Sequence, residues 1–256
     1  MFRLRLRSAV LVFAILCVFS WQAHTLYLPK RGGAARTETS GGSPSDDFEE
    51  LHQGNHLFLQ EDPALLEDLA LNGQRPPFLF LGCSDSRVSE STIFDARPGT
   101  FFTTRNIANI YSSKDSSARS TLAYGLEALR VRHVIVMGHY GCGGVAASVA
   151  TPPNLPWSEG TTAVQKWIAP IRELYHASQR KDVVKMRQQN RGKSNVAEPT
   201  LHDVGLRSLI EENVKASVKK IASDRIVTEV NLSVSTASCP QSHTANYLDM
   251  ALPALT

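Results

Sequence analysis

The chain has 256 residues, of which 42% are hydrophobic and 20% charged, enough for a full-sized core in one domain with extensions. Its formal net charge of +3 is misleading, because residues 1–37 contain six basic residues and no acidic ones. The remainder therefore has 27 − 6 = 21 basic against 24 acidic residues, or −3. No basic surface suited to nucleic acid is expected, and four cysteines are too few for a disulfide-stabilised scaffold.

The first 37 residues have the composition of a targeting segment. Three arginines are followed by an uncharged stretch, Ser8 to Pro29, whose first half is almost wholly apolar. This order is typical of a secretory signal or a short signal anchor, and an arginine-rich start without acidic residues is also typical of a mitochondrial presequence. We expect residues 1–37 to direct the chain to the secretory pathway or to a membrane anchor, with a mitochondrial destination as the alternative. Any membrane contact is expected through this segment alone, and residues 38–47, rich in Ser and Gly, are expected to form a linker.

Beyond the linker, helical and strand patterns alternate along the chain. A helical pattern runs from about Asp47 to Leu71, with Pro63 at a position suited to the first turn of a second helix. Short apolar runs bounded by turn residues predict strands, and apolar residues three or four apart predict helices. The remaining elements are predicted as strands at 78–81, 101–105, 133–137 and around 226–227, and as helices at 116–129, from 143 onward, at 164–187 and at 201–222. This alternation predicts an α/β fold, with a mainly parallel β-sheet flanked by helices.

Potential metal ligands follow two of the predicted strands. Cys83 and Asp85 come directly after the strand at 78–81, and His139 and Cys142 come after the strand that ends at Met137. Neighbouring parallel strands end at the same edge of a sheet, which is where open α/β sheets form their binding sites. Two thiolates, an imidazole and a carboxylate suit Zn²⁺ better than Mg²⁺ or Ca²⁺. The sequence therefore predicts a zinc site at this edge.

Two kinds of zinc site are compatible with these ligands. Three protein ligands with a free fourth position are typical of a catalytic site, and four protein ligands are typical of a structural one. Cys83, His139 and Cys142 are candidates in both cases, whereas Asp85 is an optional fourth ligand. If Arg87 pairs with Asp85, the fourth position stays available for water. If Asp85 binds the metal instead, the site is closed.

The run Cys83-Ser84-Asp85-Ser86-Arg87-Val88, together with His139-Tyr140-Gly141-Cys142-Gly143-Gly144, resembles the paired motifs of the β-class carbonic anhydrases. The similarity extends from about Asp47 to about Val230. It implies a β-carbonic-anhydrase-like catalytic domain over residues 48–230 that contains one Zn²⁺ per chain. It also implies a homodimer or higher homo-oligomer whose active sites lie at the subunit interface.

The resemblance also assigns roles to single residues. Zinc would be held by Cys83, His139 and Cys142, with Asp85 and Arg87 as a catalytic dyad. The substrate-binding residues would be Gln74, Phe102, Ile107 and Tyr124. The implied activity is the reversible hydration of carbon dioxide to bicarbonate and a proton by a zinc-bound hydroxide. The alternatives are hydrolysis of carbon disulfide or carbonyl sulfide at the same site, or a zinc-binding homologue without activity.

The resemblance ends at about Val230. Family members usually continue into a further strand, whereas residues 231–256 are a divergent tail that begins with a run rich in Ser and Thr. We therefore expect an atypical or truncated C-terminal end to the fold. A missing strand would leave a sheet edge exposed and would weaken the contacts between subunits.

Overall fold

The computed structural model describes residues 11–17 and 44–235, which belong to two compact units. One unit contains the N-terminal strand and everything from Arg75 onward, and the other contains the two helices that precede Arg75. The rest of the predicted targeting segment and residues 236–256 of the predicted tail lie outside the described residues. In the part of the chain that the structure describes, none of the helices combines the length and the apolar composition needed to cross a membrane.

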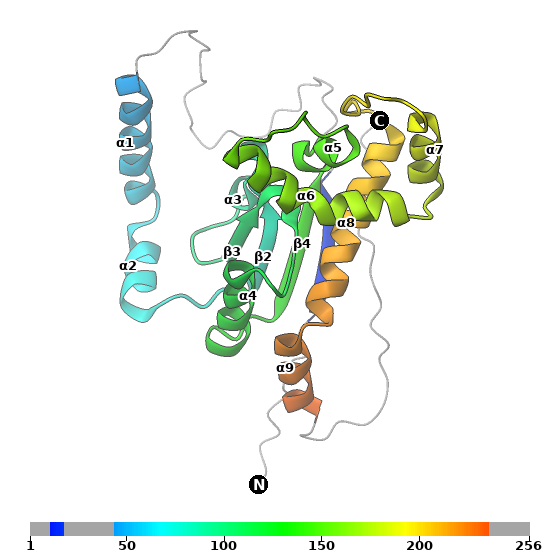
Figure 1. Ribbon diagram of the computed structural model, residues 1–256. Coiled ribbons are helices and arrows are strands. Elements are labelled where there is room, and N and C mark those ends of the chain that lie inside the picture. The colour runs from blue at the N-terminus through cyan, green and yellow to red at the C-terminus, as the bar shows by residue number, and fades with distance from the viewer. Residues whose placement is uncertain (1–10, 18–43, 236–256) are drawn as a thin grey trace. The chain divides into compact units, whose positions relative to one another are not determined.

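Four parallel strands form one sheet. They are β1 (Leu11–Cys17), β2 (Phe78–Cys83), β3 (Phe101–Asn106) and β4 (His133–His139), and their order in space is β1-β4-β2-β3 (Figure 1). Every pairing is parallel. The side chains of β2 and β4 are almost all buried, as expected for apolar strands inside a parallel sheet. The predicted α/β fold is confirmed, and the carboxyl ends of β2 and β4 lie side by side.

Helices cover both faces of the sheet, and the buried side chains of β2 and β4 alternate between two hydrophobic clusters. The helices are α4 (Ser116–Ala123), α5 (Gly143–Val149), α6 (Glu159–Ala177), α7 (Lys181–Asn190), α8 (Val204–Ala222) and α9 (Arg225–Ser235). Phe80 and Met137 pack with residues of α5, α6 and α7. Leu81 and Val136 pack with residues of α4 and α9, and α8 contributes to both clusters. The core therefore fixes β2 and β4 from both sides.

Two predicted helices have a more detailed structure than their sequence patterns indicate. The helix predicted at 116–129 is confirmed, with its last part widened to a π-helical turn over Tyr124–Ala128. The helix predicted at 164–187 is two helices, because α6 ends before the extended backbone of Ser178 and α7 begins three residues later. Arg187 Nη1 donates hydrogen bonds of 2.7–3.1 Å to three backbone carbonyls at the end of α6. These bonds satisfy carbonyls that the helix end leaves free.

The prediction of a strand around 226–227 is wrong, because these residues lie in the helix α9. The carboxylate of Asp224 accepts a hydrogen bond from the backbone N–H of Ile226 at 3.0 Å, which begins the first turn of the helix. The same carboxylate accepts a bond of 2.9 Å from the Tyr111 hydroxyl and pairs with Arg119 at 3.4 Å. Two consecutive β-branched residues predict a strand locally, but this polar anchor selects a helix.

β1 is the strand that the sequence pattern did not predict. All seven of its residues pair with β4, with Leu11 opposite His133 and Cys17 opposite His139. This segment is the centre of the apolar stretch in the predicted targeting segment. One edge of the sheet is therefore formed by residues from the N-terminal end of the chain.

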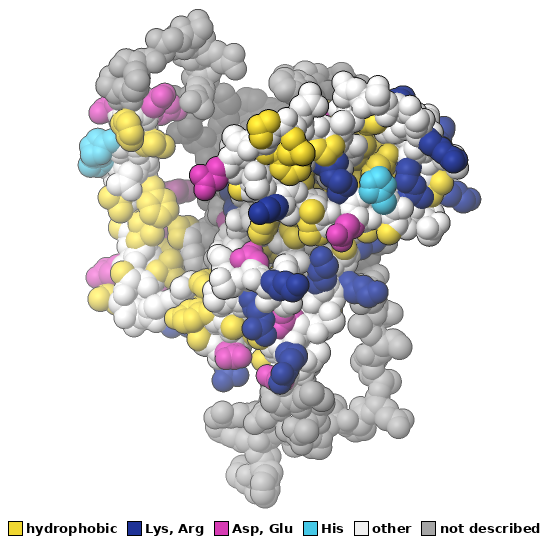
Figure 2. All heavy atoms as spheres, in the orientation of Figure 1, with side chains coloured by type: hydrophobic (Ala, Val, Ile, Leu, Met, Phe, Trp, Pro, Cys, Tyr) yellow, Lys and Arg dark blue, Asp and Glu magenta, His cyan; other side chains and the backbone are white. Residues whose placement is uncertain are grey.

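The helices of the second unit, in its described residues, are α1 (Pro44–Glu61) and α2 (Pro63–Asn72). They confirm the predicted helical segment and the start of a new helix at Pro63, where the Asp62 carboxylate caps the first turn. α1 begins inside the segment predicted as a linker. Several large apolar side chains of these helices are exposed, among them Phe48, Leu51 and Leu71 (Figure 2).

Candidate metal centre

Three potential ligands come together at the carboxyl end of the sheet. Cys83 is the last residue of β2, His139 is the last residue of β4, and Cys142 is the N-cap of α5. All three side chains are buried, and their ligand atoms lie within 4.8 Å of one another. They meet because β2 and β4 are neighbouring parallel strands and the turn after β4 returns the chain to the same edge. Among the described residues, this is the group of His, Cys, Asp and Glu side chains that could hold a metal ion.

The geometry of the donor atoms fits a tetrahedral zinc ion. The Sγ atoms of Cys83 and Cys142 are 3.9 Å apart. Two thiolates that each lie about 2.3 Å from zinc at a tetrahedral angle are separated by about 3.8 Å. His139 Nε2 is buried and has no hydrogen-bond partner in the described parts of the chain. A buried nitrogen lone pair beside two sulfur atoms is the expected arrangement for a metal ligand.

The two thiols influence each other's ionisation. The Cys142 thiol, which can donate a hydrogen bond to Cys83 Sγ, lowers the pKa of Cys83 against the opposing effect of burial. The hydrogen bond to Cys83 and burial together raise the pKa of Cys142. Because zinc binds cysteine as the thiolate, metal binding at this site should release protons from the thiols.

The backbone around Cys142 requires glycine at two positions. Gly141 has φ +74°, in the left-handed region, and a Cβ there would also lie 2.8 Å from Cδ1 of Leu201. A Cβ at Gly144 would lie 2.7 Å from Cγ2 of Ile107. Glycine at 141 therefore suits the left-handed backbone of this turn, and glycine at 144 allows Ile107 to approach it closely.

Asp85 is paired with Arg87 beside the ligand group. Arg87 Nε and Nη2 donate to the two Asp85 carboxylate oxygens at 2.9 and 2.6 Å, and the Arg87 backbone N–H donates to Oδ1 at 3.0 Å. The hydrogen bonds from Arg87 lower the pKa of Asp85 to about 2. Arg87 also donates to the Gly141 carbonyl at 3.2 Å. This bond connects the pair to the turn from His139 to Cys142, here called the ligand turn. This is the arrangement in which the fourth metal position stays available for water.

Arg105 holds the loop after β2, a role that the sequence did not indicate. Its Nε donates to the Cys83 carbonyl at 2.8 Å and its Nη2 donates to the Asp85 carbonyl at 2.6 Å. Arg105 lies on β3 opposite Gly82. Its position next to β2 could have been predicted from strand pairing, but the direction of its side chain could not.

The loop after β3 is fixed to α8. Asn213 Nδ2 donates to the Ala108 carbonyl at 2.8 Å, and Ser217 Oγ donates to the Asn109 carbonyl at 3.0 Å. Ala108 and Asn109 have φ values of +61° and +45°, so these hydrogen bonds stabilise a turn that non-glycine residues rarely adopt. The turn places Ile107 against Gly144, next to the ligand turn.

The structure places Ile107 apart from Phe102 and Tyr124, and Gln74 belongs to the other unit. Ile107 lies beside the ligand turn, with 39% of its surface exposed. The rings of Phe102 and Tyr124 are 5.7 Å apart, and Tyr124 is 55% exposed. Phe102 pairs with Leu79, four residues before Cys83 on β2, which corresponds to about 13 Å along the strand. Gln74 is an exposed residue of the unit that contains α1 and α2. Within one chain, therefore, Phe102 and Tyr124 lie away from the ligand group.

Comparisons with known proteins give a consistent family. Residues 78–235 match a family model described as carbonic anhydrase. The chain is 40% identical over 114 residues to a carbonic anhydrase of Emericella nidulans, covering 44% of this chain and 46% of the relative. It is 35% identical over 114 residues to a carbonic anhydrase of Saccharomyces cerevisiae, covering 44% of this chain and 51% of the relative. The chain thus spans about half the length of the curated relatives it matches. The crystal structure of the β-carbonic anhydrase CafA of Aspergillus fumigatus is similar with a TM-score of 0.58 and 32% identity, covering 73% of this chain and 78% of that one.

Proposed function

Because this chain belongs to the β-class carbonic anhydrase family, we propose that it catalyses the reversible hydration of carbon dioxide to bicarbonate and a proton. The observation that carries this proposal is the buried Cys83, His139 and Cys142 group with Asp85 held beside it by Arg87. These three residues would hold one Zn²⁺ per chain. Zinc bound there would supply a Lewis acid that lowers the pKa of water toward neutral.

Asp85 and Arg87 would act on the nucleophilic water. With its pKa lowered to about 2 by Arg87, Asp85 is ionised throughout the neutral and alkaline range. The carboxylate can accept a hydrogen bond from the water. This bond orients the remaining lone pairs of the water oxygen toward carbon dioxide. Arg87 holds the carboxylate with both of its oxygens engaged. A closed, inactive site would require Asp85 to leave this ion pair and become a fourth ligand.

The substrate-binding residues support an assembly of more than one chain. Ile107 could line a pocket beside the ligand group, whereas Phe102 and Tyr124 lie away from it in the same chain. We infer that a second copy supplies Phe102 and Tyr124 to the site, as part of a homodimer or a higher homo-oligomer. The exposed apolar side chains of α1 and α2 are consistent with burial against another subunit. Gln74 remains a prediction as a ligand for the bicarbonate oxygens.

The test is stopped-flow carbon dioxide hydration by the full-length chain, with zinc content measured on the same sample at several pH values. We expect one zinc per chain and a hydration rate that rises toward alkaline pH. Two thiolates would make the site more negative than three imidazoles would, so water bound there would lose its proton at a higher pH. One zinc per chain with no hydration from neutral to alkaline pH would contradict the proposed activity. Assays of carbon disulfide and carbonyl sulfide on the same sample would show whether either is a better substrate.

The oligomeric state is tested separately, by sedimentation velocity across a range of concentrations. A dimer or larger assembly is the expected species. A monomer with full hydration activity would contradict the contribution of Phe102 and Tyr124 from a second copy.

A further inference from the structure

The turn that carries two of the three ligands is attached to α8 through a tyrosine side chain. Tyr140 lies between His139 and Cys142 in the chain and is half-buried. Its hydroxyl donates a hydrogen bond of 2.8 Å to Oε1 of Glu211, which is in the middle of α8. The ligand turn is therefore connected by a side chain to a helix that contributes residues to both hydrophobic clusters.

Two arginines fix this tyrosine and its carboxylate partner. Arg180 forms an ion pair with Oε2 of Glu211, and its Nη1 also lies 3.6 Å from Oε1 of Glu212. The guanidinium carbon of Arg207 lies 4.2 Å from the centre of the Tyr140 ring, which is a cation–π distance. The carboxylate thus has one oxygen bonded to the phenol and the other to a guanidinium. Neither the ring nor its partner is free to change rotamer without losing a charged contact.

The backbone of the same tyrosine contacts the histidine ligand. His139 Nδ1 lies 3.2 Å from the Tyr140 carbonyl oxygen. A carbonyl can only accept, so Nδ1 carries a proton and donates, and in the neutral imidazole Nε2 therefore has the lone pair. Nε2 is the atom that is buried without a hydrogen-bond partner among the described residues. The Tyr140 carbonyl therefore selects the tautomer and the ring orientation in which His139 can bind a metal.

We propose that the Tyr140 side chain, anchored by Glu211 and Arg180, positions the His139 ligand by fixing the carbonyl that holds its Nδ1–H. Tyr140, Glu211 and Arg180 are positioning residues, because the side chain of none of them is among the metal ligands. This inference rests on the proposed zinc site and deepens it. It predicts that loss of one phenol oxygen, at a distance from the metal, weakens zinc binding.

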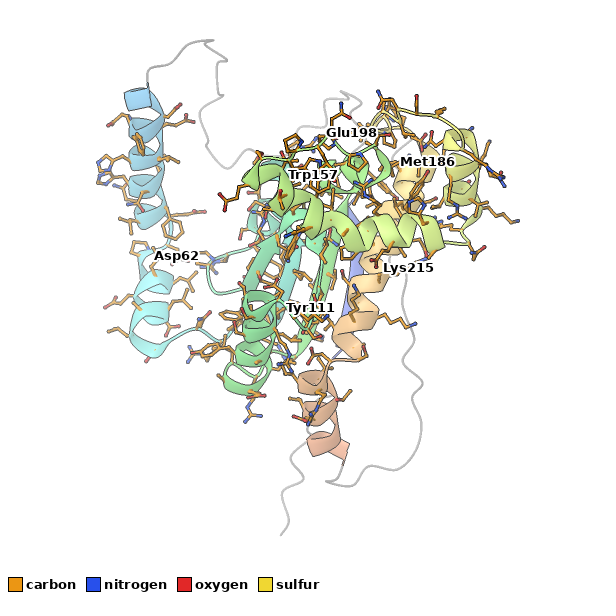
Figure 3. All side chains as sticks on the ribbon, viewed as in Figure 1. Asp62, Tyr111, Trp157, Met186, Glu198 and Lys215 are labelled. Carbon is orange, nitrogen blue, oxygen red and sulfur yellow. The ribbon has the colours of Figure 1, made fainter. Side chains whose placement is uncertain are left out.

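The chain contains a second Tyr–carboxylate–Arg group that provides a matched control. The Tyr111 hydroxyl donates to Asp224 at 2.9 Å, and Arg119 Nε lies 3.4 Å from the same carboxylate oxygen. Tyr111 (labelled in Figure 3) is buried in the hydrophobic cluster that does not contain the two cysteine ligands. It has the same kinds of polar partner as Tyr140, but among the described residues no hydrogen bond or ion pair joins it to the ligand turn. A general loss of stability should therefore affect both groups, and a loss of ligand positioning should affect only the first.

The experiment compares zinc release from the full-length parent and from Tyr140→Phe, Glu211→Gln, the double variant and Tyr111→Phe. Each zinc-loaded protein is mixed with an excess of chelator, and the rate of zinc transfer is measured. We expect Tyr140→Phe and Glu211→Gln each to release zinc about 10- to 100-fold faster, the loss typical of outer partners of a metal ligand. The double variant should be no faster than Tyr140→Phe, since Glu211→Gln acts on the ligand turn through the phenol hydroxyl that Tyr140→Phe already lacks. Tyr111→Phe should lower the denaturation midpoint and leave zinc release within about twofold of the parent.

Cobalt substitution supplies a second reading of the same geometry. With Co²⁺ bound in place of zinc, the visible absorption bands of the metal report the positions of its ligands. Relative to the parent, these bands should shift in Tyr140→Phe and Glu211→Gln and should be unchanged in Tyr111→Phe. Equal zinc release from the parent and Tyr140→Phe, or an equal acceleration in Tyr111→Phe, would overturn the positioning role alone. A parent chain that binds no zinc would overturn the proposed metal site itself, and the two failures are therefore distinguishable.

Discussion

At the scale of single residues, Asp85 and Cys83 should respond differently to substitution, because only one of them is placed as a metal ligand. Asp85→Asn keeps the size of the side chain and removes its charge. We expect this variant to retain one zinc per chain and to lose about 10- to 100-fold in turnover. Zinc analysis and stopped-flow hydration on the same sample check this result. Cys83→Ser is the control, and it should lose both zinc and activity.

The Asp85–Arg87 pair also predicts how stability depends on pH. The pKa of Asp85 is lowered to about 2 in the folded protein, below the ordinary value of about 3.9 for an unfolded chain. A group whose pKa is lower in the folded state stabilises the fold above its unfolded pKa, and this contribution disappears as pH falls toward the folded pKa. The stability difference between the metal-free parent and Asp85→Asn should therefore be constant above about pH 5 and should shrink between about pH 4 and 2. Urea denaturation at each pH measures it. A difference that grows on acidification would contradict this assignment.

The residues of the candidate metal centre could be predicted from sequence to different extents. That Cys83, His139 and Cys142 would come together was predictable, because each follows a strand pattern or a glycine turn at the same edge of the sheet. Arg105 and Glu211 were not, because their roles depend on which carbonyl or hydroxyl lies within reach after the chain has folded. Residues able to bind a metal can be recognised in a short stretch of sequence. The residues that orient them belong to segments far away in the chain, and only the fold shows which they are.

At the scale of secondary-structure elements, the start of α9 depends on one buried carboxylate. Asp224 receives hydrogen bonds from the Tyr111 hydroxyl and from the backbone N–H of Ile226, and its side chain is almost fully buried. Asp224→Ala would leave both donors without this acceptor. We expect the free energy of unfolding to fall by about 2 kcal/mol, with zinc content unchanged. Chemical denaturation and metal analysis check both parts. An unchanged denaturation midpoint would show that α9 does not depend on this anchor.

The elements that sequence patterns misassigned share one cause. The break between α6 and α7 depends on Arg187, and the helix at Ile226 depends on Asp224. In both cases a polar side chain forms hydrogen bonds with backbone groups at a helix end. The spacing of hydrophobic residues does not reveal such a contact. The strands β2 and β4 were predictable because burial on both faces requires a continuous apolar run.

At the scale of the whole molecule, β1 should contribute to stability and to solubility. Deletion of residues 1–17 removes the strand that pairs with β4, and it leaves the N–H and C=O groups on that side of β4 without β1. We expect a lower denaturation midpoint and concentration-dependent self-association. Deletion of residues 1–10 is the matched control, because it removes the three arginines and keeps the strand. Thermal denaturation and light scattering distinguish the two variants. Equal behaviour of both would show that β1 contributes little.

The pairing of β1 with β4 has a consequence for the route that a newly made chain can follow. If residues 1–37 act as a targeting segment, the apolar residues that a translocation machinery would recognise include Leu11–Cys17, which the sheet also uses. One segment cannot be threaded through a channel and paired with β4 at the same time. The order of folding and recognition during synthesis would then decide the destination. A chain that pairs β1 with β4 early would bury its targeting signal and would stay in the compartment where it was made.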